Sequence, residues 1–382
     1  MMARTMRRLL PLALLCIAST LPAQSAADAS ARLGPQFMSY NIKAPVNQKI
    51  SEFAVPLYVL IPATDALSFD VGTAWAHATV TSPGSPTSTL SGLTDTQIRA
   101  NYAIGTDFIV LTAGLNLPTG KSGALPNEQP AATRIASDFL VFPITGFGTG
   151  AGGTGGIALA HPFGDWNAGF GLAMRHSVAY NPFQDSTGNK LRFQPGDEYR
   201  ARIGLDHPFG TGRISVGLTY SKFGNDQANA TVYNSGDRYI SQATITNSLN
   251  GVDITIAGWD LLRAAGQLAD TTHTGLENIG NGGVAFGFHT ASGLTIEPSV
   301  NERVWTQLSP SGSTASAPNI SFMTMVGLRF NYDMGSYAIT PYVGYATGQI
   351  GGTGGINGIS DNGANSHLTG FNASLAIRLG GY

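Results

Sequence analysis

Charged residues alternate with apolar ones between positions 198 and 223 of this chain, and these charges are the strongest candidates for chemistry. Successive side chains of a β-strand point to opposite faces, and a Pro/Gly turn joins the two alternating halves, so the stretch predicts an amphipathic β-hairpin. Its charged positions are Glu198, Arg200, Arg202, Asp206 and Arg213. A soluble protein would bury the apolar face in a core. In an outer-membrane barrel that face meets lipid and the charges line the interior, where they can select solutes by size and charge.

The same parity assigns further residues to the polar face in other alternating segments. They are Asp70, Arg99, Asn101, Arg175, Glu297, Arg303, Arg329 and Arg378. A mid-strand arginine that faced lipid would cost ~2–4 kcal/mol, so the inward position is the firm part of this prediction. Arginine outnumbers acid on this face, which favours anionic solutes. Two interpretations stay open: side chains that line a pore, or a salt-bridged filling that only rigidifies the barrel.

Other candidate chemistry is weaker. Asp206 and His207 could form half of an acid–base pair, as in barrel proteases, but His207 lies in a short turn away from the extracellular rim. Lys121 follows Gly120 as in a phosphate-binding loop, but that motif needs a further glycine where Leu115 stands. The histidines show no metal-ligand spacing. The net charge of −2 gives no indication of nucleic acid as a partner. We therefore expect no enzyme activity, no metal and no cofactor.

The first residues indicate export. Arg4, Arg7 and Arg8 precede an apolar run from Leu9 to Leu21, and small residues follow, so residues 1–27 predict a cleaved signal peptide. The only cysteine, Cys16, lies within it, so the mature chain has no disulfide. No later stretch approaches ~18 uninterrupted apolar residues, and a chain without such a helix enters a membrane only as a barrel. Residues 28–382 are expected to form one outer-membrane barrel domain of a Gram-negative bacterium.

Alternating segments recur along the chain and predict an all-β, up-and-down antiparallel transmembrane barrel. Counting from Phe37 gives 16 strands, with 12 or 14 as alternatives. Short turns and long loops alternate without a break, as periplasmic turns and extracellular loops do in such barrels. The longest loop, Pro118–Gly155, is long enough to fold inside and constrict the lumen, although Phe139 to Phe147 could also be a strand. Thr81–Leu93 is expected to be another long loop.

Two short motifs carry a family resemblance. Residues 114–121 read Gly-Leu-Asn-Leu-Pro-Thr-Gly-Lys, and residues 196–199 read Gly-Asp-Glu-Tyr. Both resemble segments of the outer-membrane barrel family known as "MetA-pathway of phenol degradation" proteins, which is distantly similar to hydrophobic-compound and fatty-acid channels. The resemblance covers residues 50–382 and implies an outer-membrane barrel that moves hydrophobic or aromatic compounds. It supplies no catalytic residues.

These observations predict a channel or porin-like protein for passive uptake or efflux of small solutes, with anionic or aromatic compounds favoured. The alternative is a structural or surface-interaction barrel with a closed lumen and partner-binding loops. A barrel hydrolase and a soluble periplasmic β protein are further rivals. The expected partners are outer-membrane lipid, small solutes and the barrel assembly machinery. The machinery would recognise a terminal aromatic such as Tyr382, which here is one residue out of phase with the apolar positions of the last strand.

Overall fold

The computed structural model describes residues 29–45, 47–105, 108–267, 273–308, 319–351 and 365–380. The predicted signal peptide, 1–27, and Tyr382 lie outside these residues. Within them, no helix has the length and apolar character needed to cross a membrane.

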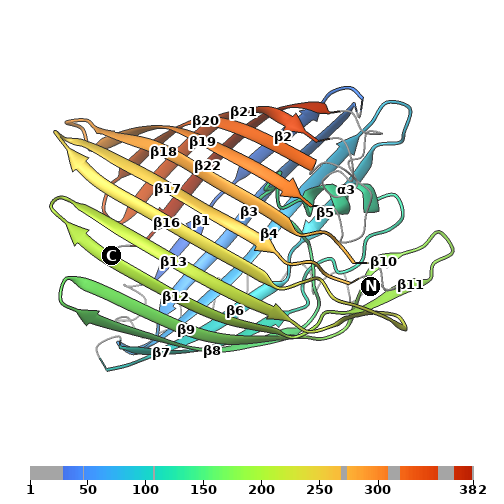
Figure 1. Cartoon of the computed structure of the whole chain (residues 1–382), viewed down its shortest axis with the longest axis horizontal. Coiled ribbons are helices and arrows are strands. Elements are labelled where there is room, and N and C mark those ends of the chain that lie inside the picture. The colour runs from blue at the N-terminus through green and yellow to red at the C-terminus, as the bar shows by residue number, and fades with distance from the viewer. Residues whose placement is uncertain are drawn as a thin grey trace, which may run out of the picture.

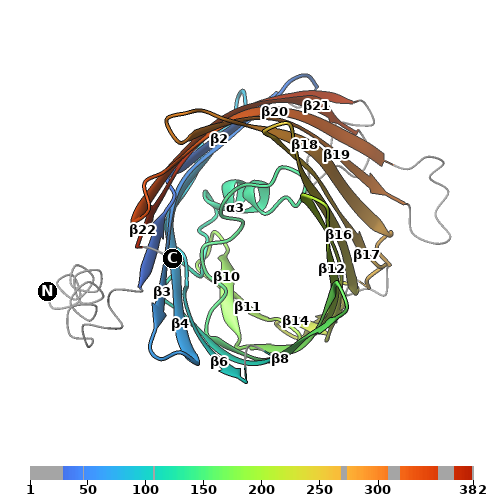
Figure 2. The same ribbon diagram turned by 90° about the vertical axis from the view of Figure 1, so that its left-hand side faces the viewer.

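The chain forms one large antiparallel sheet that closes on itself (Figures 1 and 2). Its segments are β1 (Ser30–Leu33), β2 (Gln36–Ile42), β3 (Gln48–Pro62), β4 (Leu67–Thr81), β5 (Ser88–Leu93), β6 (Thr96–Ile104), β7 (Ile109–Leu117), β8 (Gly152–Phe163), β9 (Trp166–Ser177), β12 (Glu198–Phe209), β13 (Gly212–Phe223), β16 (Arg238–Leu249), β17 (Val252–Arg263), β18 (Glu277–His289), β19 (Leu294–Gln307), β20 (Asn319–Asp333), β21 (Tyr337–Ile350) and β22 (Ser366–Leu379).

These 18 segments make 16 strands, as the sequence predicts, and not 12 or 14. Segments β1 and β2 both pair with β3 on one side and with β22 on the other, so they are two halves of one strand. Segments β5 and β6 likewise pair with successive parts of β4. The pairing of β22 with the first strand closes the barrel, so among the described residues the barrel sheet has no unpaired edge strand.

The two faces of each strand differ as the alternation predicts. On β12, Tyr199 and Ile203 are 51% and 52% exposed on the outer face, whereas Glu198 is 3% exposed on the inner face. The apolar face of the hairpin consists of exposed large side chains: Tyr199, Ile203, Leu205, Val216 and Leu218. Strand β12 pairs with β13 from Glu198 opposite Phe223 to Phe209 opposite Gly212, so the predicted hairpin is present.

Short turns gather at one end of the barrel, on the left in Figure 1. Glycine occupies the left-handed backbone conformation at several of them, for example Gly210 with φ of 53° and Gly251 with φ of 79°. Asn250, before Gly251, also has a positive φ of 52°, the Asn-Gly pattern typical of two-residue hairpins. The long connections lie at the opposite end.

Several strands extend further toward that opposite end than predicted. The range Thr81–Leu93 is not one loop, because β5 occupies Ser88–Leu93. Strand β17 continues to Arg263 and β18 begins at Glu277, within the stretch expected to be a loop. The added part of β18 is polar and rich in glycine, so it lacks the apolar alternation. The added part of β17 is not polar: its Trp259 and Leu261 pack against the buried apolar cluster inside the barrel.

Residues 118–151, termed the inner segment from here on, leave β7 and pack within the ring of strands (Figure 2). They contain a short helix, α3 (Gln129–Ile135), and no strand, so Phe139 to Phe147 is a loop. Side chains of the inner segment, including Ile135, Phe139 and Leu140, are almost fully buried against the barrel wall. The wall is lined there by small residues, such as Ala54 and Ala76, which leave room for them.

Two other long connections form a second, four-stranded sheet of their own. It consists of β10 (Tyr180–Gln184), β11 (Lys190–Gln194), β14 (Asp226–Ala228) and β15 (Thr231–Tyr233). The inner segment joins this sheet through backbone hydrogen bonds, because Ala124 N donates to Pro182 O at 2.8 Å and Gln184 N donates to Ala124 O at 3.1 Å. The inner segment and the second sheet are therefore connected directly.

Candidate functional site

A row of directly paired residues crosses six neighbouring strands on the inner face. Its members, from β4 through β6, β7, β8 and β9 to β12, are Asp70, Arg99, Gly114, Thr154, Arg175 and Glu198. The row has an acid and an arginine at each end and two small residues in the middle. Four of the predicted inner residues thus come together, although they lie on strands that are far apart in the sequence.

Glu198 anchors one end of the row. Its side chain is 4% exposed and forms ion pairs with Arg200 Nη2 at 2.6 Å and with Arg175 Nε at 3.4 Å. The two arginine side chains are 52% and 54% exposed. One buried carboxylate therefore holds two guanidinium groups that remain in contact with water, which leaves a surplus of one positive charge.

Asp70 anchors the other end. Its carboxylate accepts hydrogen bonds from Arg99 Nε at 2.7 Å, from Asn101 Nδ2 at 2.8 Å and from the hydroxyl of Tyr58. Both predicted inner residues, Arg99 and Asn101, are thus neighbours of Asp70. Tyr58 was not predicted, because it belongs to the long apolar strand β3 and only the pairing of β3 with β4 brings its hydroxyl to Asp70.

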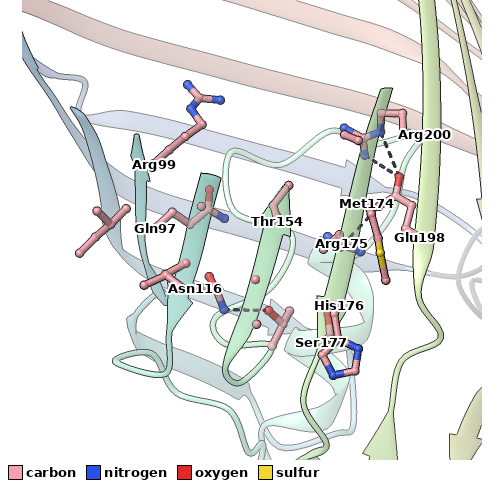
Figure 3. A pocket seen from close by; sticks show the side chains of 17 residues that line it. Gln97, Arg99, Asn116, Thr154, Met174, Arg175, His176, Ser177, Glu198 and Arg200 are labelled. Carbon is pink, nitrogen blue, oxygen red and sulfur yellow. Dashed lines mark hydrogen bonds and ion pairs between the residues drawn. The ribbon is translucent and has the colours of Figure 1, made fainter. Parts of the chain in front are cut away.

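A hollow of about 280 Å³ lies between the two ends of the row (Figure 3). Gly114, which has no side chain, and Thr154 occupy the row positions between Arg99 and Arg175 and belong to its lining; these two positions are termed the floor of the hollow. Gln97 and Asn116 also line it (Figure 3). Arg99 stands on one side of the hollow, and Arg175 and Arg200 stand on the other (Figure 3).

A second hollow of about 430 Å³ lies further along the same wall and includes Arg202, Asp206 and Ser215 in its lining. Asp206 accepts hydrogen bonds from Arg213 Nε at 2.5 Å and from Ser215 Oγ at 2.6 Å. Arg202 makes no hydrogen bond or ion pair with any residue that the structure describes. Arg213, on the other strand of the hairpin, is its ion-pair partner.

Two more predicted arginines lie on other strands and form separate ion pairs. Arg329 Nη1 contacts Glu297 Oε1 at 2.7 Å across the β19–β20 pair. Arg378 Nη2 contacts Asp333 Oδ2 at 2.9 Å near the short-turn end. Neither pair belongs to the lining of the hollow in Figure 3.

Arg303 differs from the other predicted arginines because the inner segment covers it. It is 6% exposed, donates from Nη1 to Phe139 O at 2.9 Å, and lies over the Trp259 ring at 5.5 Å from the centroid. Its position on the inner face agrees with the alternation. The inner segment, and not an open lumen, lies against its guanidinium group.

Asp95, which was not among the predicted site residues, holds both ends of the inner segment. One carboxylate oxygen accepts Gly120 N at 3.0 Å, and the other accepts Thr149 N at 2.7 Å and Asn116 Nδ2 at 2.9 Å. Asp95 is 8% exposed and lies in the interruption between β5 and β6. No periodicity marks such a position, so only the fold reveals it.

The motif at residues 114–121 turns the chain from β7 into the inner segment. Thr119 Oγ1 accepts Thr96 N at 2.8 Å. A Cβ on Gly120 would lie 2.1 Å from Phe147 O, so only glycine fits there. The ammonium group of Lys121 pairs with Glu128. These contacts give the Thr-Gly-Lys sequence a packing role in place of the phosphate-binding loop considered above.

Glu52, on strand β3 beside β4, holds a further part of the inner segment. It is fully buried, and its Oε1 accepts Ile144 N at 2.8 Å. Arg263 adds an ion pair with Asp138 at 2.6 Å and one with Glu277 at 2.5 Å. The inner segment is therefore attached through backbone and side-chain polar groups as well as through its apolar core.

The described residues offer little geometric support for acid–base catalysis or for metal binding. Asp206 and His207 are adjacent in β12 and point to opposite faces, and His207 stacks on the Trp166 ring at 4.4 Å. His176 Nδ1 lies 2.7 Å from Asp197 Oδ1 at an exposed position near the loop end. In the described part of the chain, no group of three or more His, Cys, Asp or Glu residues could hold a metal ion. The expectation that the chain is not an enzyme stays a prediction.

The fold and site define a closed, 16-stranded antiparallel β-barrel with an apolar exterior and a charged, partly filled interior. No protein-family model and no curated protein matches the chain. The family resemblance of the two short motifs therefore stays a hypothesis.

Among solved structures, the chain is similar to a bacterial polysaccharide outer membrane secretin, with 9% identity, a TM-score of 0.47, and coverage of 92% of this chain and 99% of that chain. It is also similar to an anion-selective porin from Comamonas acidovorans, with 11% identity, a TM-score of 0.42, and coverage of 92% and 98%. An outer membrane channel from Pseudomonas putida F1 has 12% identity, a TM-score of 0.39, and coverage of 94% and 96%. At these values the similarities carry no argument about what this chain does.

Proposed function

We propose that this protein is an outer-membrane channel for the passive passage of small solutes, with a preference for anions. The proposal rests on the solvent exposure of inward-pointing arginine side chains in the barrel wall. The side chains of Arg175, Arg200 and Arg213 are 54%, 52% and 63% exposed, although all three belong to the inner face. Water therefore reaches the wall of the lumen, and fixed positive charge there favours anions.

The exterior supports a membrane location. Large apolar and aromatic side chains are exposed around the outer face, as at Leu115, Phe170, Val326 and Tyr345. A soluble barrel would not leave so many of them in water, whereas lipid covers such a band in outer-membrane barrels. We infer that outer-membrane lipid is the surrounding partner. Export through residues 1–27 and insertion by the barrel assembly machinery belong to the same proposal.

The inner segment makes the passage narrow and selective rather than wide. It fills part of the lumen with a buried apolar core and leaves the hollows along the β6–β16 wall. A barrel of 16 strands without such a segment would hold a broad aqueous channel. The proposed solutes are therefore small anions, including the aromatic compounds that the family resemblance implies.

A second candidate is a closed barrel whose outer loops bind a partner. The observation that favours it is the four-stranded sheet β10–β11–β14–β15, which stands apart from the barrel and joins the inner segment. In this alternative the inner segment is a permanent seal and the second sheet is the binding surface.

Conductance in planar lipid bilayers separates the two candidates. The channel should give discrete conductance steps and a reversal potential that favours anions in a salt gradient. Replacing both Arg200 and Arg202 by alanine should reduce the anion preference, whereas Lys222→Ala, which removes a charge from the outer face, should not. No conductance, or a selectivity that the double replacement leaves unchanged, would overturn the channel proposal.

A further inference from the structure

We propose that the hollow between Arg99 and the Arg175–Arg200 pair is a binding site for a small monocarboxylate. This inference rests on the proposed function in one respect only, because the ligand must reach the hollow from the lumen. It goes further by assigning a particular site and ligand charge to one place on the barrel wall.

The charges around the hollow match a single negative charge. Arg99 and Asp70 form a one-to-one pair at 2.7 Å. Arg175 and Arg200 share Glu198. The five groups together carry a charge of about +1 at neutral pH, because carboxylates and guanidinium groups are both ionised there. A monocarboxylate would balance this charge, whereas a neutral solute would leave it unbalanced.

The anchoring carboxylates leave donors on the guanidinium groups. Each guanidinium carries five N–H donors in a planar fork. In its ion pair, Arg99 uses Nε and Nη2, and Arg200 also uses Nε and Nη2, while Arg175 uses Nε. Within the described part of the chain, at least one terminal nitrogen of Arg175 and of Arg200 has no protein partner, whereas Arg99 also interacts with the Tyr58 hydroxyl. Such groups form charge-assisted hydrogen bonds with carboxylates.

The backbone spacing keeps the two sides apart. Arg99 and Arg175 are three strands apart in one row, which corresponds to about 14 Å at the usual strand separation. Gly114 and Thr154 fill the positions between them. A Cβ on Gly114 would lie 3.6 Å from the Thr154 Cβ, so a larger side chain there would project into the hollow. The missing side chain therefore keeps the floor open.

The size and lining restrict the body of the ligand. A volume of about 280 Å³ is at the lower end of ligand pockets, so the ligand is small. Away from the arginines, the lining includes the uncharged groups of Gln97, Thr154 and Ala173. These groups suit an uncharged body, and a second carboxylate would find no further positive charge to balance it.

The other ion pairs of the inner wall do not share this arrangement. Arg213 pairs with Asp206, and Arg329 pairs with Glu297, in each case one to one. Neither pair flanks the glycine and threonine floor. These arginines therefore provide a control for a general effect of positive charge in the lumen.

Benzoate is the probe, and benzamide is its neutral counterpart of nearly the same shape. Calorimetry on the folded full-length barrel in detergent should show benzoate binding and much weaker benzamide binding. The double variant Arg175→Met and Arg200→Met should weaken benzoate binding by about tenfold or more, because charged hydrogen bonds are lost. Arg329→Met should retain the affinity.

A second variant, Gly114→Val, keeps every charge. It tests the site even if the arginine variants fail to fold. Valine suits a strand and should reduce benzoate binding by filling the floor. Heat-modifiable gel mobility reports whether each variant is folded. Equal affinity for benzoate and benzamide, equal affinity for inorganic phosphate, or binding that Gly114→Val leaves unchanged would overturn the site.

The two proposals fail separately. A barrel that conducts but shows no benzoate binding retains the channel function and loses the carboxylate site. A barrel that binds benzoate in detergent but never conducts retains the site and loses the channel function.

Discussion

Replacing Asp95 by alanine should release both ends of the inner segment from the barrel wall. The variant loses the acceptor for Gly120 N and Thr149 N, whose distances to the carboxylate are 3.0 and 2.7 Å. A hydrogen bond to a charged group contributes about 1.5–3 kcal/mol. At the lower value, two lost bonds amount to about 3 kcal/mol, which raises the population of the detached segment about 150-fold.

Trypsin provides the assay, because the inner segment contains Lys121 and Arg134. Where detachment is fast compared with cleavage, the cleavage rate follows the detached population. The Asp95→Ala variant should therefore be cut within the inner segment far faster than the unmodified protein. In planar bilayers it should also show larger and noisier conductance, since the detached segment no longer narrows the lumen.

Asp65→Ala is the matched control, because Asp65 is exposed in a short turn at the opposite end of the barrel. It should leave both the cleavage rate and the conductance unchanged. Folded Asp95→Ala that is cleaved no faster than the control would refute the anchoring role of Asp95. The remaining contacts, such as that between Glu52 and Ile144 N, would then hold the inner segment without Asp95.

Three further predictions concern other parts of the molecule. Ile203→Arg places a charge on the outer face and should reduce the free energy of unfolding in lipid vesicles by ~2–4 kcal/mol, whereas Gly204→Arg, on the inner face, should cost far less. Ser88 Oγ accepts a hydrogen bond from Ala131 N of α3 at 3.1 Å and donates one to Asn127 O, in the turn before α3, at 2.7 Å. Ser88→Ala removes both bonds, and amide hydrogen exchange should show that the free energy of opening α3 falls by about 1–2 kcal/mol. In the turn between β10 and β11, hydrogen bonds lower the pKa of Asp185 to about 2, and the largest contribution comes from the Thr187 hydroxyl. The ionised carboxylate should therefore stabilise this turn fully above the ordinary carboxyl pKa, and the stabilisation should be lost as the pH falls through about 2. Carboxyl NMR should show that the pKa of Asp185 rises in Thr187→Val.

The period-two alternation assigned the faces and gave a count of 16 strands, although it left 12 or 14 as alternatives. Tyr199 and Arg200 lie on opposite faces because neighbouring side chains of a strand must do so. The same rule assigned the inner face to residues as far apart as Asp70 and Arg378. It failed at β5 and at the start of β18, where polar residues and glycine interrupt the alternation, and at the end of β17, where apolar Trp259 and Leu261 face the filled interior.

The partners of the inner residues did not follow from the alternation. Asp70 and Arg99 meet because β4 pairs with β6 in one particular register, and a shift by two residues would separate them without changing either face. Glu198 holds Arg175 because β12 also pairs with β9. Asp95 had no signal at all, since its role depends on where the inner segment enters and leaves the barrel.

The sequence by itself determined the strand pattern, the apolar exterior and the inward direction of the charges, because each depends only on the order of neighbouring residues. Only the tertiary structure decided which charges form pairs and where the inner segment packs. It also decided that Arg303 is buried while the Arg200 side chain remains exposed to solvent. These outcomes depend on register and on the closure of the barrel, which bring residues far apart in the chain to within hydrogen-bonding distance.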